Sequence, residues 1–198
     1  MYARRALLFM IVTMNRCEWA GEKDELMLRY HDEEWGVPIH DDAVHFEYLV
    51  LDSFQAGLSW KTILHRREGF RTAFAQFDVR KVAKFTDTDK ARLIQDTGII
   101  RNTLKIDATI KNAISFIAIQ KEFGSFDTYV WRFVGEHTQV NEIVTISDYR
   151  ATSPESEVMS KDLKKRGFSF VGPTICYAYM QAAGLVNDHS VGCFCRNK

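Results

Sequence analysis

Four side chains with metal-binding chemistry lie near the two ends of the chain. Cys17 and His31 are close to the start, and His189 and Cys193 are close to the end. The spacing of four between His189 and Cys193 suits two ligands on one helix face, one turn apart. Two cysteines and two histidines with no open position form a structural zinc site, which would tie together chain ends that otherwise fray. Because more than 150 residues separate the two pairs, spacing alone leaves open packed histidines beside reduced cysteines, and Cys195 could compete with Cys193 as a ligand.

A second candidate site is a glycine-bounded turn, Gly167 to Gly172, which directly follows Lys164, Lys165 and Arg166. A hairpin of this kind between two helices exposes backbone N–H groups, and the start of the following helix adds its dipole. Together with the cations, these groups would hold a phosphate without reading base sequence. The alternative is a plain connection between two helices with a solvated basic end, which the pattern alone favours.

Most of the chain between His31 and His189 carries helical sequence patterns. Apolar residues recur near a 3.6 period, Ser, Asp or Asn residues stand where helices begin, and Gly residues stand where they end. The longest pattern, from Asn102 to Phe123, carries a predicted buried stripe of Ile106, Ile110, Ala113, Ile114 and Ile117. The other predicted helices are 42–54, 60–64 after Ser59, 79–85 after Asp78, 86–98, 126–134, 154–166 after Ser153 and 173–184 after Gly172. No βαβ alternation is present, and only Gln139 to Tyr149 reads as possible extended chain, so the predicted fold class is all-α.

The composition supports one globular domain. The chain has 198 residues, of which 46% are hydrophobic and 26% are charged, enough for a sizeable core and against general disorder. The 26 basic and 26 acidic residues cancel, which excludes a polybasic tail but leaves room for a local basic face. Four cysteines are too few and too unevenly placed for a disulfide scaffold.

Residues 1–13 differ in character from the rest of the chain. Two arginines precede a short apolar run, Ala6 to Val12, which resembles a minimal signal peptide but lacks a small-residue cleavage site. The run is far shorter than the roughly 20 apolar residues that span a bilayer. We therefore interpret residues 1–13 as an extension ahead of a start at Met14, and 14–198 as a single domain of a soluble, cytoplasmic protein with no membrane association.

Several longer blocks resemble one family, DNA-3-methyladenine glycosylase I of the helix-hairpin-helix superfamily. The resemblance runs in order from about Cys17 to Cys193 and covers nearly the whole chain beyond the extension. The blocks that carry it are Cys17-Glu-Trp19, Tyr30-His31-Asp-Glu-Glu-Trp35-Gly-Val-Pro38, Phe54-Gln-Ala-Gly-Leu-Ser-Trp60, Gly98-Ile-Ile-Arg101, Lys164-Lys-Arg-Gly-Phe-Ser-Phe-Val-Gly-Pro-Thr-Ile-Cys-Tyr177 and Gly184-Leu-Val-Asn-Asp-His189.

The resemblance implies an all-α helix-hairpin-helix bundle in which a zinc site joins the N- and C-terminal segments. It assigns the structural Zn²⁺ to Cys17, His31, His189 and Cys193, and the DNA-binding hairpin to residues 167–172. It also implies a monomeric enzyme that excises N3-methyladenine from double-stranded DNA containing alkylated bases.

The chemistry expected of such an enzyme fits the residue types in these blocks. Methylation at N3 gives adenine a positive charge and makes it a good leaving group, so the protein must mainly flip the nucleotide out and hold its base. Aromatic faces hold a cationic ring, at about 0.5 to 2 kcal/mol per contact. The blocks supply Trp19, Tyr30, Trp35 and Trp60, and we predict that these residues and Gln55 bind the base. For Trp131 we expect an ordinary core position.

Asp52 is the predicted catalytic residue, and it departs from the family pattern. The familiar family member has glutamate at this position and glycine at the next, where this chain has Ser53. Aspartate keeps the negative charge that favours a cationic base and an oxocarbenium-like sugar, but its shorter side chain can require a bridging water. Whether Asp52 activates the attacking water or only binds the base stays open, and a surface carboxylate is the alternative. Asp188, beside His189, is expected to orient a neighbour or cap a helix.

The turn from Gln55 through Gly57 to Leu58 is a candidate for filling the gap that a flipped nucleotide leaves in the base stack, with the side chain of either Gln55 or Leu58 entering it. An ordinary connection between helices is the alternative. No lysine in the blocks is placed as a Schiff-base nucleophile, which favours a glycosylase without strand cleavage. Two other functions stay open: a helix-hairpin-helix protein that binds DNA damage without cleaving it, and a glycosylase for a different alkylated base.

Overall fold

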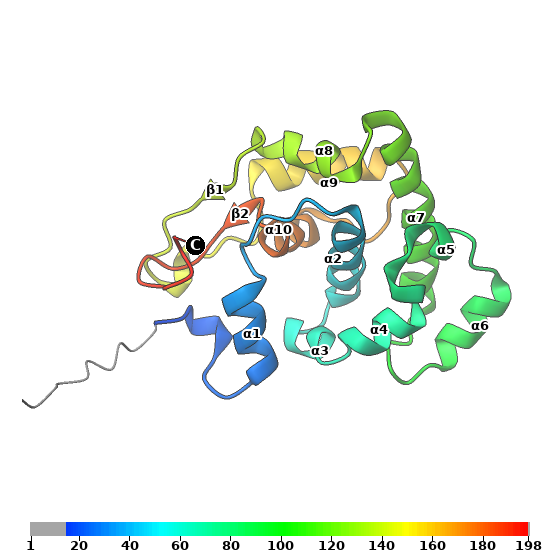
Figure 1. Cartoon of the computed structure of the whole chain (residues 1–198), viewed down its shortest axis with the longest axis horizontal. Coiled ribbons are helices and arrows are strands. Elements are labelled where there is room, and N and C mark those ends of the chain that lie inside the picture. Colours follow the sequence, from blue (N-terminus) through cyan, green and yellow to red (C-terminus); the bar gives the residue numbers. More distant parts are fainter. Residues whose placement is uncertain (1–14, 198) are drawn as a thin grey trace, which may run out of the picture.

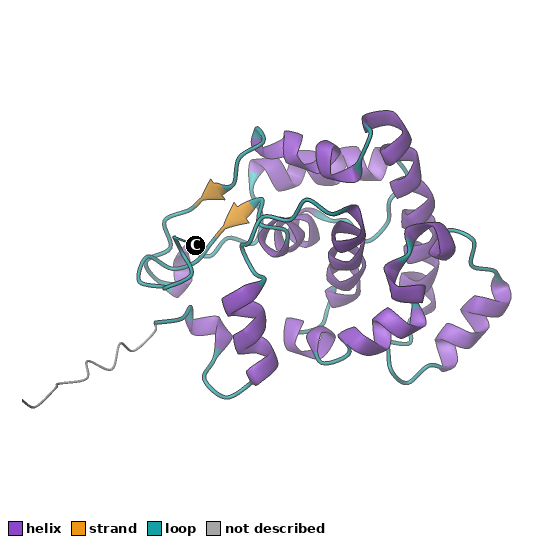
Figure 2. Ribbon diagram, viewed as in Figure 1, coloured by secondary structure: helices purple, strands orange, loops and turns teal. Residues whose placement is uncertain are grey.

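The computed structural model describes residues 15–197, so the predicted extension, residues 1–13, lies outside the described part of the chain. The described chain is mostly helical, as the sequence predicts (Figures 1 and 2). Its α-helices are α1 (Glu25–Glu33), α2 (Asp42–Gln55), α3 (Trp60–Leu64), α4 (Arg67–Ala73), α5 (Val79–Val82), α6 (Asp87–Gln95), α7 (Thr103–Phe123), α8 (Phe126–Trp131), α9 (Pro154–Lys165) and α10 (Pro173–Ala182). Four 3₁₀ turns, η1 (Glu18–Ala20), η2 (Ala75–Phe77), η3 (Arg132–Val134) and η4 (Ile146–Asp148), and two short strands, β1 (Gln139–Val140) and β2 (Val186–Asn187), complete the list.

Side-chain caps start the helices where the sequence places them. The Ser59, Asn102 and Ser153 side chains accept hydrogen bonds from backbone N–H groups in the first turns of α3, α7 and α9. The Asp78 carboxylate caps α5 in the same way. These bonds satisfy N–H groups that have no partner inside the helix.

Three predicted details are wrong. The helix after Asp78 ends at Val82 and does not include Phe85, and α6 ends at Gln95, three residues before Gly98. In α7, Ile114 is 55% exposed, whereas Phe116 and Ile119 are buried. The reason is that α7 contacts four other helices, α2, α5, α6 and α8, so its buried face is not one straight stripe.

The segment after α8 is extended only in part. Gln139 and Val140 pair in parallel with Val186 and Asn187, and a single bridge joins Ile143 to Ser190. The chain then closes into η4. This pairing holds the 139–149 segment against the C-terminal segment, which brings η4 toward the site described below.

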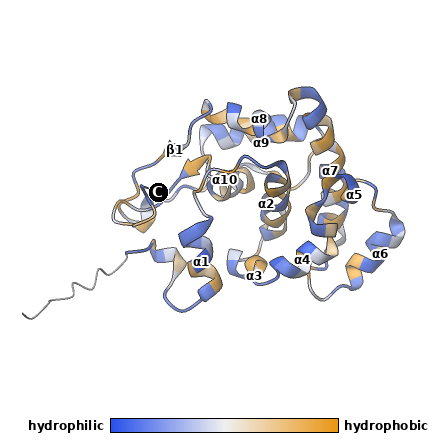
Figure 3. Cartoon of the chain, viewed as in Figure 1, coloured by the Kyte–Doolittle hydropathy of each residue, from blue (hydrophilic) through white to orange (hydrophobic). Residues whose placement is uncertain are grey.

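Helices α2 and α10 pack together in the middle of the molecule, and α9 packs on α10 (Figure 1). Figure 3 shows hydrophobic residues along α10, α2 and α7. Fully buried aromatic rings fill the core, and the Phe116 and Phe126 rings stack with centroids 3.9 Å apart. The N-terminal segment with η1 and α1 lies next to the C-terminal loop. Within residues 15–197, no helix is both long and apolar enough to cross a membrane.

Candidate functional site

The four predicted metal ligands come together although they belong to opposite ends of the chain. Cys17, His31, His189 and Cys193 are all buried, and their donor atoms lie within 4.8 Å of one another. The Cys17 and Cys193 Sγ atoms each lie 3.4 Å from His189 Nδ1, and Cys193 Sγ lies 3.5 Å from His31 Nε2. Tetrahedral bonds of about 2.3 Å to sulfur and about 2.0 Å to nitrogen require sulfur–nitrogen separations of about 3.5 Å. The geometry therefore fits a tetrahedral ion of zinc size.

Both imidazoles are oriented by a second hydrogen bond. His31 Nδ1 lies 2.8 Å from the Asp32 carboxylate, and His189 Nε2 lies 2.9 Å from the Trp35 carbonyl oxygen. Each ring nitrogen that donates to oxygen leaves the other nitrogen free to bind a metal, an arrangement typical of metal-ligating histidines. Burial raises the pKa of the Cys17 thiol, but hydrogen bonds with His189 and His31 outweigh burial and lower it to about 4.

Cys195 is buried next to this cluster but does not belong to the four-residue group. Its Sγ lies 3.7 Å from the Asp32 carbonyl oxygen, and it groups instead with His31 and Asp32. The geometry therefore favours Cys193 over Cys195 as the fourth ligand.

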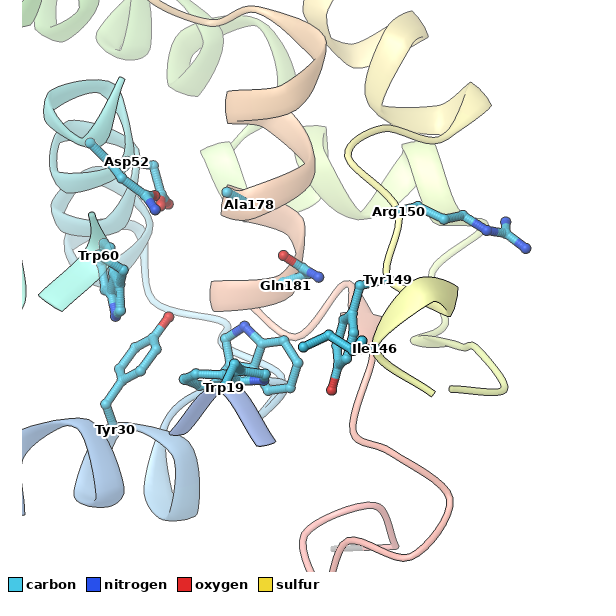
Figure 4. Close-up of a pocket in the computed structure, with 11 residues that line it drawn as sticks. Trp19, Tyr30, Asp52, Trp60, Ile146, Tyr149, Arg150, Ala178 and Gln181 are labelled. Carbon is cyan, nitrogen blue, oxygen red and sulfur yellow. The ribbon is translucent and has the colours of Figure 1, made fainter. Parts of the chain in front are cut away.

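A cavity of about 370 Å³ opens beside the metal-type cluster, within the size range of ligand pockets. Figure 4 shows side chains from both halves of the chain facing it. The residues that line it are Trp19, Tyr30, Trp35, Asp52, Gln55, Trp60, Ile146, Tyr149, Arg150, Ala178 and Gln181. All six side chains predicted from sequence to bind or act on the base are in this set.

Aromatic rings form the wall nearest the metal-type cluster. The Tyr30 and Trp60 ring centroids lie 5.0 Å apart, and those of Trp19 and Trp35 lie 4.7 Å apart. Trp19 follows Cys17 by two residues and Tyr30 directly precedes His31, so the same short segments carry metal-type ligands and pocket walls. Trp60 comes from the first turn of α3, which Ser59 caps.

Asp52 reaches the cavity from the buried face of α2. Asp52 is 2% exposed, and its Oδ2 atom has no hydrogen-bond partner among the described residues. Burial raises the pKa of this carboxyl well above its ordinary value. The Nε1 atoms of Trp19 and Trp60 are also buried and have no hydrogen-bond partner within residues 15–197. Since buried polar atoms are almost always hydrogen-bonded, three free ones around one cavity indicate a site built for a polar ligand.

The sequence did not indicate the opposite wall. Ile146, Tyr149 and Arg150 come from η4 and the residues after it, and Ala178 and Gln181 come from α10. No local pattern singles these residues out, because long-range contacts of the 139–149 segment with the C-terminal segment, including the β1–β2 pairing, hold the first three near the cavity.

Asp188 orients a neighbour, as expected. Its buried carboxylate accepts hydrogen bonds from Asn141 Nδ2 at 2.7 Å, Tyr177 Oη at 2.8 Å and Gln181 Nε2 at 2.7 Å. Trp131 is a core residue, also as expected, and its Nε1 donates to the Ile39 carbonyl oxygen at 3.1 Å.

The turn after α2 has a defined geometry. The Leu58 N–H donates to the Gln55 carbonyl oxygen at 2.6 Å, Ala56 has φ −47° and ψ 114°, and Gly57 has φ +78°. These values describe a type II β-turn, in which the third residue needs a positive φ and is therefore glycine. Leu58 is 40% exposed at the end of the turn.

The hairpin joins α9 to α10. Gly167 has φ +93°, whereas Gly172 has φ −63° and is the residue before the first turn of α10. Lys164 and Lys165 are exposed, and no ion pair is found for either in residues 15–197. Arg166 donates to Glu122 and Asp162, each at 2.7 Å, so much of its charge is already compensated.

The chain matches the family model described as methyladenine glycosylase over residues 19–196. It is 49% identical over 182 residues to DNA-3-methyladenine glycosylase 1 of Escherichia coli (strain K12), covering 92% of this chain and 97% of the relative. It is 43% identical over 181 residues to DNA-3-methyladenine glycosylase of Haemophilus influenzae, and this match covers 91% of this chain and 97% of the relative. Among solved structures, it resembles a variant of 3-methyladenine DNA glycosylase I in complex with 3-methyladenine, with TM-score 0.90, 35% identity and coverage of 93% of this chain and 99% of that one. With this match and the arrangement of its pocket, the chain belongs to the methyladenine glycosylase family.

Proposed function

We propose that this protein excises 3-methyladenine from double-stranded DNA by hydrolysing the N-glycosidic bond, leaving an abasic site without strand cleavage. The observation that carries the proposal is an aromatic-lined cavity that also contains a buried carboxylate oxygen of Asp52, for which the described chain supplies no hydrogen-bond partner. Two relatives named for this activity are 49% and 43% identical to the chain over 182 and 181 aligned residues.

The cavity suits a positively charged purine. The electron-rich faces of Tyr30 and Trp60 attract a cationic ring, and the Asp52 carboxylate supplies the opposite charge at close range. Burial raises the pKa of Asp52, but a bound cation favours the ionised form. The anion therefore forms where the positive charge of the base, and then of the sugar, has to be stabilised.

Two hydrogen-bond acceptors in the cavity favour adenine over guanine. Because the Asp188 carboxylate accepts from Gln181 Nε2 at 2.7 Å, the amide of Gln181 has its Oε1 atom turned to the cavity (Figure 4). Gln181 Oε1 and Asp52 Oδ2 can each accept from the exocyclic amine of adenine. Guanine presents a carbonyl oxygen at the same ring position, which is an acceptor as well.

The absence of a nucleophilic lysine supports hydrolysis. No lysine is among the cavity-lining residues of the described chain, so no amine is available there to form a Schiff base with the sugar. Water is the remaining nucleophile, and among the described residues Asp52 is the one carboxylate that lines the cavity.

The hairpin and the type II turn are the proposed DNA contacts. The exposed Lys164 and Lys165 and the free backbone N–H groups around Gly167 and Gly172 suit phosphates, while Leu58 suits the gap in the base stack. We also propose that the protein acts as a monomer and, as a DNA repair enzyme, in the cytoplasm.

We further propose that Cys17, His31, His189 and Cys193 hold a structural Zn²⁺ ion. Four protein ligands leave no open position for a substrate. The ion would hold Trp19, Tyr30 and Trp35 in place because these aromatic residues flank the ligands in sequence.

The direct test is release of free 3-methyladenine from methylated duplex DNA. We expect release by the wild-type protein and a rate lower by about 100-fold or more for Asp52→Ala, because a charge that acts in the transition state is lost. Release no faster than with Asp52→Ala would contradict the proposal. Tight binding of methylated duplex without release would favour a damage-binding protein, and release of 7-methylguanine would favour a different alkylated base.

A further inference from the structure

Lys105 is a buried cation that the proposed reaction does not use. It lies in the first turn of α7 and is 7% exposed. No carboxylate forms an ion pair with it among residues 15–197. Burial lowers the pKa of its ammonium group. A buried lysine without a carboxylate is costly unless other groups satisfy its charge.

Backbone carbonyl oxygens at the end of α2 satisfy this charge. Lys105 Nζ donates to the Phe54 carbonyl oxygen at 2.8 Å and to the Ala56 carbonyl oxygen at 2.6 Å. The last carbonyl groups of a helix lack partners within the helix, and the helix dipole makes this end favourable for a cation. Lys105 therefore caps α2 at the point where the type II turn begins.

The carbonyl oxygens of Phe54, Gln55 and Ala56, where α2 ends and the turn begins, all accept hydrogen bonds. Lys105 binds those of Phe54 and Ala56, and the Leu58 N–H binds that of Gln55. The backbone of the turn is held on both sides, while the Leu58 side chain stays exposed. Such a turn presents Leu58 in one fixed position.

The same helix also holds the hairpin. Asn112, seven residues after Lys105 and 1% exposed, donates to the Ser169 carbonyl oxygen at 3.0 Å and accepts from the Ser169 N–H at 2.8 Å. Residues seven apart lie on one helix face, about 10 Å apart along the axis. Lys105 Nζ also lies 5.9 Å from the centre of the Phe170 ring, next to Ser169.

We propose that Lys105 is a positioning residue that fixes the Leu58 turn relative to the phosphate-binding hairpin, so that Leu58 enters the base stack as the damaged nucleotide leaves it. This inference rests on the proposed function. Lys105 would then matter for extruding a stacked base and not for holding a base that is already outside the stack. Its amine is occupied by two carbonyl groups, which also keeps it from attacking the sugar.

Lys105→Met tests this role because methionine keeps the length of the side chain and removes its donors. Single-turnover excision is measured on two duplexes, one with 3-methyladenine opposite thymine and one with the same lesion opposite an abasic site, where unstacking is easier. We expect the rate of Lys105→Met to fall by about tenfold or more on the paired lesion and by no more than about threefold on the unpaired one. The affinity for free 3-methyladenine should stay within about twofold.

Two further variants complete the test. Lys111→Met removes an exposed lysine of the same helix and should behave as wild type. Leu58→Ala should reproduce the selective loss on the paired lesion, and the double variant with Lys105→Met should be no more than about threefold slower than the slower single variant, because both changes interrupt one step.

An equal loss on both duplexes, a loss of free-base affinity, or an unchanged rate on the paired lesion would each overturn the role of Lys105. If the wild-type protein released no 3-methyladenine from either duplex, the proposed function itself would fail.

Discussion

At the scale of single residues, the sequence indicated one wall of the cavity and missed the other. Trp19, Tyr30 and Trp60 lie in blocks whose residue types suggest aromatic chemistry, Asp52 comes just before one of these blocks, and all four line the cavity. Gln181 carries no such signal. The orientation of its side chain depends on a hydrogen bond to Asp188, which also accepts hydrogen bonds from Asn141 and Tyr177. These residues come together only in the folded chain.

The raised pKa of Asp52 predicts a stability cost at neutral pH. The folded chain keeps the Asp52 proton at pH values where the unfolded chain has released it, so the free energy of unfolding falls as the pH rises through the folded pKa. Asp52→Asn removes this cost. We expect it to be more stable than wild type at pH 7 to 8, with a difference that vanishes below about pH 4, when melting temperatures are measured across this range.

Asp148→Asn is a control of opposite sign. Hydrogen bonds from the backbone of Thr145 and Val144 lower the pKa of the Asp148 carboxyl. Its stabilising effect is present above the unfolded pKa and is lost as the pH falls through the folded pKa, so this variant should be less stable than wild type at pH 7. A destabilised Asp52→Asn protein at neutral pH would contradict the assigned environment of Asp52.

Replacement of Gln181 tests recognition of the exocyclic amine. Gln181→Met removes the oxygen that faces the cavity, and a lost hydrogen bond should weaken binding of free 3-methyladenine by about 3- to 10-fold. Binding of 3-methylpurine, which lacks the amine, should change by less than about twofold in the same calorimetric titration. Gln95→Met, on α6 outside the cavity, serves as the control. Equal weakening for both ligands would mean that Gln181 only fills space.

At the scale of elements, local sequence signals predicted where helices begin but not which helix faces are buried. Ser59, Asn102 and Ser153 cap the predicted helices, because a cap depends on neighbours within four residues. The exposure of Ile114 could not be predicted in this way. It depends on which helices surround α7, and this is a property of the tertiary structure.

The two glycines of the hairpin look alike in sequence but differ in the structure. Gly167 has φ +93°, and a Cβ atom there would lie 3.1 Å from Ser115 Oγ, whereas Gly172 has φ −63° and open space around it. We expect Gly167→Ala to lower the free energy of unfolding by about 1 to 2 kcal/mol. Gly172→Ala should change it by less than about 0.5 kcal/mol. Urea unfolding measures both, and equal effects would contradict the described hairpin.

At the scale of the whole molecule, sequence spacing could not establish that the segment with Cys17 and His31 meets the segment with His189 and Cys193. Spacing alone could not decide between a metal site and separate packed residues, since 158 positions separate His31 from His189. The structure places the four donor atoms within 4.8 Å of one another. The parallel pairing of β1 with β2 contributes to this arrangement by fixing the C-terminal segment.

If the four residues hold the proposed Zn²⁺ ion, its removal should affect both the stability of the protein and the pocket. The purified protein should contain about one zinc per chain, and Cys17→Ser should contain much less. Chelation should lower the melting temperature by about 5 °C or more, because metal binding contributes directly to folding. It should also weaken binding of free 3-methyladenine, since Trp19 and Tyr30 flank the ligands. A metal-free protein of unchanged stability and affinity would contradict this account.

The central claim is that the aromatic cavity beside Asp52 holds the methylated base. A crystal structure of the protein with free 3-methyladenine tests it most directly. We predict that the purine ring lies against Tyr30 and Trp60, with its exocyclic amine within hydrogen-bonding distance of Asp52 or of a water bound to it. A ring bound elsewhere, or a cavity that stays without the base at saturating concentration, would contradict the account.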